Sequence, residues 1–169
     1  EIPAFATEES EIIYSYIPIE AADTYRSYTQ WKNSGSFAAL KVDGSVVTWG
    51  DPTTGGDSTS VNLTNVRRIF SNYYSFAALK QDGTVVTWGN ASYGGDSSSV
   101  SNSLTNIETI SSTETSFAAL KSDGTVISWG DSSTGGDSST ITNELVNVRE
   151  IYSNKFAFAA LKQDGTVVT

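Results

Sequence analysis

The chain has 169 residues, 38% of them hydrophobic, and contains no Cys, Met or His. Disulfides and the usual zinc and haem sites are therefore excluded, the commonest general base is absent, and we predict no cofactor. Nineteen acidic and ten basic residues give a net charge of −9, which argues against a nucleic-acid partner, and no stretch is apolar enough for membrane insertion.

Residues 1–23 are predicted to form an N-terminal strand or extension outside the rest of the pattern. Within them, residues 11–20 are rich in β-branched and aromatic side chains and contain Pro18. Proline within a strand-like run is typical of an edge strand. The chain starts at Glu1 without a visible signal peptide, so we expect a processed or partial chain.

Residues 24–169 form the repeat domain, in which one motif is written four times. The copies begin at Phe37, Phe76, Phe117 and Phe158, which lie 39, 41 and 41 residues apart. Three copies continue to a Trp-Gly pair, whereas the fourth reaches Thr169 one position before its Trp. A fixed period of this length is typical of an array of units that each need a neighbour to bury their core.

Each copy is predicted to be a β-hairpin. In the second copy, residues 76–80 and 84–88 flank Asp82-Gly83, a pair that favours a two-residue turn. Such a turn sets Trp88 opposite Ala77 and Phe76 opposite Gly89, so that neither ring faces a bulky residue. Both faces of the hairpin carry apolar residues, and we therefore expect each hairpin to be sandwiched between neighbours.

A polar loop ending in Gly-Gly-Asp-Ser follows each complete hairpin, at 55–58, 94–97 and 135–138. Beyond each loop, an apolar segment leading to Ile69, Ile110 or Ile151 predicts a further strand. The fold class is therefore all-β, with three to four antiparallel strands in each unit. The predicted structural core comprises the repeated aromatic residues Phe37, Trp49, Phe76, Trp88, Phe117, Trp129 and Phe158.

The motif Phe-Ala-Ala-Leu-Lys-x-Asp-Gly-x-Val-x-x-Trp-Gly resembles the repeat of the regulator-of-chromosome-condensation family, over residues from about 30 to 169. In that family, each repeat forms one blade of a β-propeller. The resemblance therefore implies that this chain folds into a propeller-like array of about four short blades, the last of them incomplete. The repeats of this chain are shorter than those of the family's eukaryotic members. The chain has about four repeats, whereas the propeller of that family has seven. The loop after each hairpin has the sequence Gly-Gly-Asp-Ser in place of the family's usual Gly-Gln-Leu-Gly. They are more similar to degenerate versions in long, repetitive bacterial surface proteins.

The incomplete last blade leaves an open sheet edge, and such edges recruit strands. One interpretation is that the chain is part of a longer protein. The other is that residues 11–20, from the same or the next copy, complete the blade. Donation within a chain closes a ring, whereas donation between subunits builds a fibre.

Several polar and aromatic residues are weak site candidates. Asp57, Asp96 and Asp137 repeat in the Gly-Gly-Asp-Ser loops and are candidates for calcium, although one Asp per loop more commonly caps a turn. Asn62 and Asn90 begin sequences that match the N-glycosylation pattern. Tyr73, Tyr74, Tyr93 and Tyr152 are candidates for a sugar-stacking platform, with core or rim packing as the alternative.

No catalytic constellation is present, because the acids that recur do so in every repeat, and we predict that the chain is not an enzyme. We expect a non-enzymatic structural protein that is extracellular or on the cell surface: a surface or filament component that self-associates through its N-terminal strand and open last blade. The alternative is a glycan- or protein-binding module of a larger adhesin or toxin. The acidic, hydroxyl-rich composition supports secretion.

Overall fold

The structure is a computed structural model that describes residues 32–169. The predicted N-terminal strand at 11–20 lies outside these residues, as does Trp31 at the start of the first repeat. The described chain folds into four small antiparallel sheets joined by loops with short 3-10 helices, which confirms the all-β fold class. None of the helices in this part of the chain is long and apolar enough to cross a membrane.

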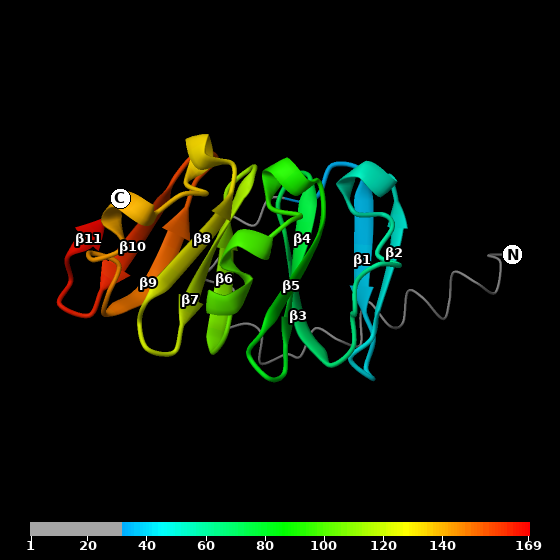
Figure 1. The fold of residues 1–169 in the computed structure, drawn as a ribbon, viewed down its shortest axis with the longest axis horizontal. Coiled ribbons are helices and arrows are strands. Elements are labelled where there is room, and N and C mark those ends of the chain that lie inside the picture. Colours follow the sequence, from blue (N-terminus) through cyan, green and yellow to red (C-terminus); the bar gives the residue numbers. More distant parts are fainter. Residues whose placement is uncertain (1–31) are drawn as a thin grey trace, which may run out of the picture.

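The four sheets follow one another in chain order and stand side by side (Figure 1). In each, every strand pairs with its neighbour in the sequence. The first sheet contains β1 (Ser36–Leu40) and β2 (Val46–Gly50), and the second contains β3 (Val66–Ser71), β4 (Ser75–Lys80) and β5 (Val85–Gly89). The third contains β6 (Ile107–Ser112), β7 (Ser116–Lys121) and β8 (Val126–Gly130), and the fourth β9 (Val148–Ser153), β10 (Phe158–Lys162) and β11 (Val167–Val168).

Single turns of 3-10 helix follow three of the hairpins. They are η2 (Pro52–Thr54), η3 (Ala91–Tyr93) and η5 (Ser132–Thr134), and η4 (Ser98–Ser103) and η6 (Ser139–Ile141) come later in the same loops. Asp51, Asn90 and Asp131 cap the first three through side chains that accept a backbone N–H two residues on. These caps fix the start of each loop that leads to the next sheet.

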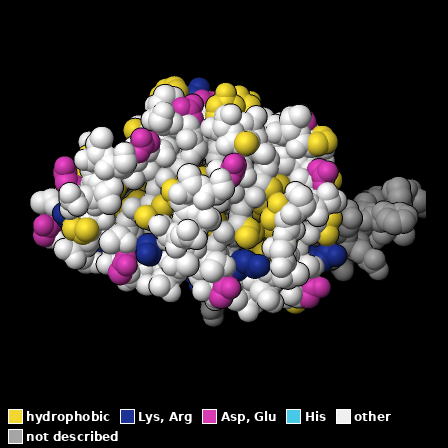
Figure 2. All heavy atoms as spheres, viewed as in Figure 1, with side chains coloured by type: hydrophobic (Ala, Val, Ile, Leu, Met, Phe, Trp, Pro, Cys, Tyr) yellow, Lys and Arg dark blue, Asp and Glu magenta, His cyan; other side chains and the backbone are white. Residues whose placement is uncertain are grey.

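The hydrophobic core lies between successive sheets. One cluster joins Val66 and Ala78 of the second sheet to Ala38 and Leu40 of the first, and equivalent clusters lie between the second and third sheets and between the third and fourth. Figure 2 shows acidic side chains scattered over the visible face, with some hydrophobic side chains among them. The hairpins of the second and third sheets are thus packed on both faces, as predicted, whereas those of the first and fourth sheets have a described neighbour on one face.

The predicted aromatic core is correct for the middle of the array and wrong at its start. Phe76, Trp88, Phe117 and Trp129 are at most 4% exposed, and Phe158 is half-buried. In contrast, Phe37 is 62% exposed and Trp49 is 44% exposed. The reason is positional: each Phe and Trp is covered by the loop of the preceding sheet, and no sheet precedes the first one within the described residues.

The predicted hairpin register is wrong by one residue. Phe76 lies opposite Trp88 and Ser75 opposite Gly89, and the first and third hairpins show the same shift. The turn has three residues, 81–83: Lys80 N–H donates to the Thr84 carbonyl at 2.9 Å, and Gly83 adopts φ +80°. This is a type I turn followed by a left-handed residue, and it places the two rings face to face.

Candidate functional site

The most distinctive repeated contact joins one sheet to the next through a tryptophan. The Trp88 ring stacks on Phe76 with centroids 5.1 Å apart, and its indole N–H donates to the Gly55 carbonyl in the preceding loop at 3.0 Å. Trp129 repeats this arrangement, with Phe117 at 5.3 Å and the Gly94 carbonyl at 3.1 Å. We call this unit, a Phe–Trp pair beneath the glycine of the preceding loop, the aromatic joint.

Glycine is required in the loop of the aromatic joint for two reasons. Gly94 adopts φ +93°, a backbone conformation that other residues resist. A Cβ at this position would also lie 2.7 Å from the Phe117 ring, and the same distance separates the Cβ positions of Gly55 and Gly135 from Phe76 and Phe158. The loop therefore touches the next sheet through bare backbone.

Two backbone contacts repeat beside each joint. At the hairpin turns, Val66 N–H donates to the Gly44 carbonyl of the preceding sheet at 2.9 Å, and Ile107 and Val148 repeat the contact. The second contact lies at the turn that joins β3 to β4 and at the equivalent place in the other blades. Here the backbone N–H of one blade donates to the backbone carbonyl of the next: Ser34 to Tyr73, Tyr73 to Glu114 and Glu114 to Lys155, at 2.9–3.1 Å. Together with the aromatic joint, these bonds fix one geometry between neighbouring sheets.

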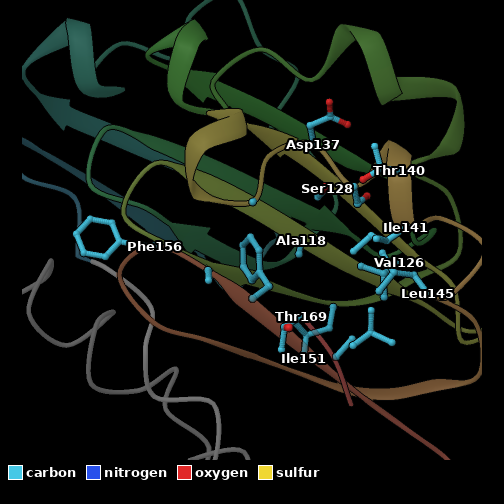
Figure 3. A pocket seen from close by; sticks show the side chains of 16 residues that line it. Ala118, Val126, Ser128, Asp137, Thr140, Ile141, Leu145, Ile151, Phe156 and Thr169 are labelled. Carbon is cyan, nitrogen blue, oxygen red and sulfur yellow. The ribbon is translucent and has the colours of Figure 1, made fainter. Parts of the chain in front are cut away.

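The aromatic joint is half-made at both ends of the described array. At the start, Phe37 and Trp49 stack at 5.5 Å but are exposed, with no described loop over them. At the other end, Gly135 lies over the Phe158 ring, but no described tryptophan donates to its carbonyl. A cavity of about 280 Å³ lies at this place, between β8 and β10 (Figure 3).

The three calcium candidates lie apart, each in its own loop. Asp57, Asp96 and Asp137 are exposed, and each Oδ1 accepts the backbone N–H of the residue two positions on, at 2.8–2.9 Å. These bonds lower the pKa of all three carboxyls. No group of three or more His, Cys, Asp or Glu that could hold a metal ion occurs among the described residues.

Both glycosylation candidates lie at turns. Asn62 is exposed, and its Oδ1 accepts the Thr64 hydroxyl at 2.8 Å. Asn90 is half-buried and caps η3 through Ser92 N–H at 3.1 Å. Whether a glycan is attached stays a prediction.

Three of the tyrosines come together. Tyr74 lies between Tyr73, whose ring centroid is 5.0 Å away, and Tyr93, at 4.7 Å. Tyr73 is 38% exposed, and its neighbours are half-buried. We name these three residues the tyrosine cluster. Tyr93 is separated from the other two by the hairpin of β4 and β5, and Tyr152, the fourth tyrosine of the predicted platform, lies in β9 of the last sheet.

The aspartates of the hairpin turns should make stability depend on pH. Asp82 Oδ1 accepts the Thr84 hydroxyl at 2.6 Å and the Thr84 N–H at 2.9 Å, and these bonds lower the pKa of Asp82 below 3.8. The other hairpins have the same arrangement and the same direction of shift, at Asp43, Asp123 and Asp164. Because the folded-state pKa is the lower one, the stabilisation is present above pH 3.8 and is lost as the pH falls below it.

We expect the melting temperature to fall between about pH 5 and pH 2 as these carboxyls are protonated. A variant with Asn at all four positions should show a smaller fall, because the amide oxygen still accepts both bonds but does not titrate. Thermal melts followed by circular dichroism across this range measure both slopes. Equal slopes for the two proteins would contradict a role for the turn carboxylates.

Four sheets of this kind, packed one on the next and joined in the second and third sheets by a complete aromatic joint, are blades of a β-propeller. Solved propeller structures match the chain. Yeast Prp20p matches at 18% identity and a TM-score of 0.54, over 79% of this chain and 41% of that one. The yeast RCC1 (Prp20) structure bound to Kap60 matches at 18% identity and a TM-score of 0.58, over 81% and 42%. Human WBSCR16 matches at 20% identity and a TM-score of 0.54, over 80% and 45%.

The fold is thus that of part of an RCC1-like β-propeller, which confirms the family resemblance at the level of fold. The chain spans less than half the length of each of these structures. No family model and no curated protein matches the sequence.

Proposed function

We propose that this chain is a non-enzymatic structural protein, a component of an extracellular surface or filament that assembles by joining blades of different copies. The observation that carries the proposal is the aromatic joint, a contact by which one blade docks on the loop of the blade before it and which repeats at Trp88 and Trp129. A contact that repeats in one geometry suits the stacking of blades from different copies as well as of blades in one chain.

The distribution of exposed apolar side chains supports the same proposal. Among residues 32–169, eight large hydrophobic side chains are exposed; seven of them lie in the first or last blade, and only Tyr73 lies between these blades. Exposed apolar surface at two opposite ends suits a heterologous, head-to-tail contact, which grows into a fibre when it does not close. The acidic, hydroxyl-rich composition without Cys or Met supports a place outside the cell.

Removing residues 1–23 is expected to abolish assembly if these residues donate the completing strand. The blades should stay folded, because every described strand begins at or after Ser36. Sedimentation velocity and electron microscopy over a concentration series at neutral pH measure assembly, and far-UV circular dichroism measures folding.

A matched control keeps the full length but scrambles the order of residues 11–20. If a specific strand is donated, this variant should also fail to assemble. Normal assembly by the truncated chain would contradict strand donation.

A glycan- or protein-binding module of a larger adhesin or toxin is a second candidate. The tyrosine cluster favours it, because neighbouring aromatic rings at the surface are suited to stacking on apolar faces of a ligand. A glycan array without hits would count against the carbohydrate version.

A further inference from the structure

The tyrosine cluster departs from the repeat pattern at each of its three positions. Tyr73 corresponds to Ser34, Glu114 and Lys155 in the other blades, Tyr74 to Gly35, Thr115 and Phe156, and Tyr93 to Thr54 and Thr134. The other blades therefore form without a tyrosine at any of these positions. Because the three departures meet in space, the cluster is a feature of this surface and not a requirement of the blade.

The loop that carries Tyr93 is held without its side chain. In the third blade, the equivalent Thr134 is 7% exposed, and its hydroxyl bonds to the Ser116 hydroxyl at 2.6 Å. In the second blade, Ser75 donates instead to the backbone carbonyl of Tyr93 at 2.7 Å, and the Tyr93 ring packs on Tyr74. None of the three phenol hydroxyls of the cluster forms a hydrogen bond with a described residue. The rings and hydroxyls are thus available to a partner.

The cluster lies at an edge of the array that is rich in carboxylates. The turn that joins β3 to β4 and the end of β5 lie there together, because Ser75 pairs with Gly89. The loops with η2, η3 and η5 lie at the same edge, opposite the hairpin turns (Figure 1). Its acidic residues are Asp51, Asp57, Asp96, Glu114, Asp131 and Asp137, and its basic residues within the described part of the chain are Lys32 and Lys155. This excess of carboxylates favours a positively charged partner.

The fourth blade shows how this edge holds a cation. Lys155 Nζ lies 5.1 Å from the centroid of the Phe156 ring and 3.4 Å from a carboxylate oxygen of Glu114. In the second blade, tyrosines take both of the corresponding positions, and no cation of the described chain lies over their rings. Tyr73 N–H donates to the Glu114 carbonyl at 3.0 Å, so the same glutamate also borders the tyrosine cluster. The cluster therefore has the rings and the carboxylate of such a site but lacks the cation.

We propose that the tyrosine cluster and Glu114 bind an arginine side chain from a basic segment of another protein, with the guanidinium over a tyrosine ring and paired with the glutamate carboxylate. The 38% exposure of Tyr73 opens its ring to a partner. Arginine suits the site better than lysine, because its planar guanidinium stacks on aromatic faces and pairs with a carboxylate through two hydrogen bonds. This inference names the partner for the second candidate function and rests on that function.

The probe is the capped peptide acetyl-Gly-Arg-Gly-amide. Its control is the same peptide with citrulline in place of arginine, which keeps the planar end of the side chain but removes the charge. Each peptide is titrated into the isotope-labelled full chain and followed by two-dimensional NMR. We expect the arginine peptide to shift the amide signals of Tyr73, Tyr74 and Glu114 with a Kd on the order of 10 mM. The citrulline peptide should bind at least about fivefold more weakly, because it loses the cation–π contact and the ion pair.

A pair of variants tests the location. Tyr73→Ser combined with Tyr93→Thr introduces the residues of the first blade, so the second blade should stay folded while the arginine peptide binds at least about fivefold more weakly. The matched control is Tyr152→Ser, which removes an exposed tyrosine of β9 outside the cluster and should leave the Kd unchanged. Equal binding of the arginine and citrulline peptides, shifts that avoid the cluster, or equal binding by the two variants would overturn the inference.

Glu114→Gln tests the carboxylate. The arginine peptide should bind this variant about threefold more weakly, and its Kd should change less between about 20 mM and about 500 mM NaCl, because salt screens an exposed ion pair. An unchanged Kd with an unchanged salt dependence would overturn the placement of the guanidinium at Glu114.

A glycan array on the same protein separates this inference from the second candidate function. Carbohydrate binding without arginine binding would overturn the inference and support the binding module, whereas no ligand in either assay would contradict both. Sedimentation without peptide measures self-assembly separately. A chain that binds the arginine peptide but stays monomeric supports the inference and contradicts the filament proposal.

Discussion

Replacing Trp88 with alanine is expected to lower the free energy of unfolding by about 3–5 kcal/mol, as for other large aromatic residues removed from a core. Trp88 is 3% exposed, stacks on Phe76 and donates its only N–H to the Gly55 carbonyl. The substitution therefore leaves a cavity between two blades and also removes the hydrogen-bond donor from a buried carbonyl.

Trp49 provides a matched control, because it stands at the same place in its repeat and stacks on Phe37 in the same way. It is 44% exposed, and no described loop covers it. Trp49→Ala should therefore cost about 1 kcal/mol, the order of an exposed aromatic pair.

Urea unfolding followed by far-UV circular dichroism measures both variants, since each substitution alters the fluorescence signal itself. In a repeat protein, the blades can unfold separately, so the comparison uses the first transition as well as the midpoint. A loss below about 1 kcal/mol for Trp88→Ala, or equal losses for the two variants, would contradict the aromatic joint as the main contact between blades.

The fold was predictable because the sequence repeats. Four copies of one motif at a nearly constant spacing indicate a unit that stacks on itself, and an error in one copy is corrected by the others. The third strand of each unit, ending near Ile69, Ile110 and Ile151, was found in the same way and appears as β3, β6 and β9.

The register was not predictable from Asp-Gly alone, because that pair occurs in both two-residue and three-residue turns. The missed signal is the residue after the glycine, which is Ser45, Thr84, Thr125 or Thr166 in the four copies. In every copy, the hydroxyl and the N–H of this residue both donate to the aspartate Oδ1, and the glycine between the two residues has a positive φ.

The aromatic joint could not be predicted from a single repeat, because its parts belong to two successive repeats. Nothing in the sequence marks a glycine carbonyl as a hydrogen-bond acceptor. The stacking of Phe on Trp depends on the hairpin register, and the predicted register places Phe76 opposite Gly89 and not opposite Trp88. The exposed state of Phe37 and Trp49 has the same origin: identical residues are buried or exposed according to whether a neighbouring loop covers them.

Replacing Gly94 with alanine should test the loop side of the joint and is expected to cost about 3 kcal/mol or more. Two effects add. The left-handed φ of +93° costs a residue with a side chain about 1–2 kcal/mol, and the new Cβ would lie 2.7 Å from the Phe117 ring, which has to move within a packed core at about 1–3 kcal/mol.

Gly165 separates these two effects. It has φ +86°, close to that of Gly94, but a Cβ built on it meets nothing within 4 Å. Gly165→Ala should therefore cost only the conformational part, about 1–2 kcal/mol. The difference between the two variants in urea unfolding reports the close approach of one blade's loop to the next blade's ring. Equal losses would mean that backbone conformation alone explains the glycine, and that the loop and the ring can separate without penalty.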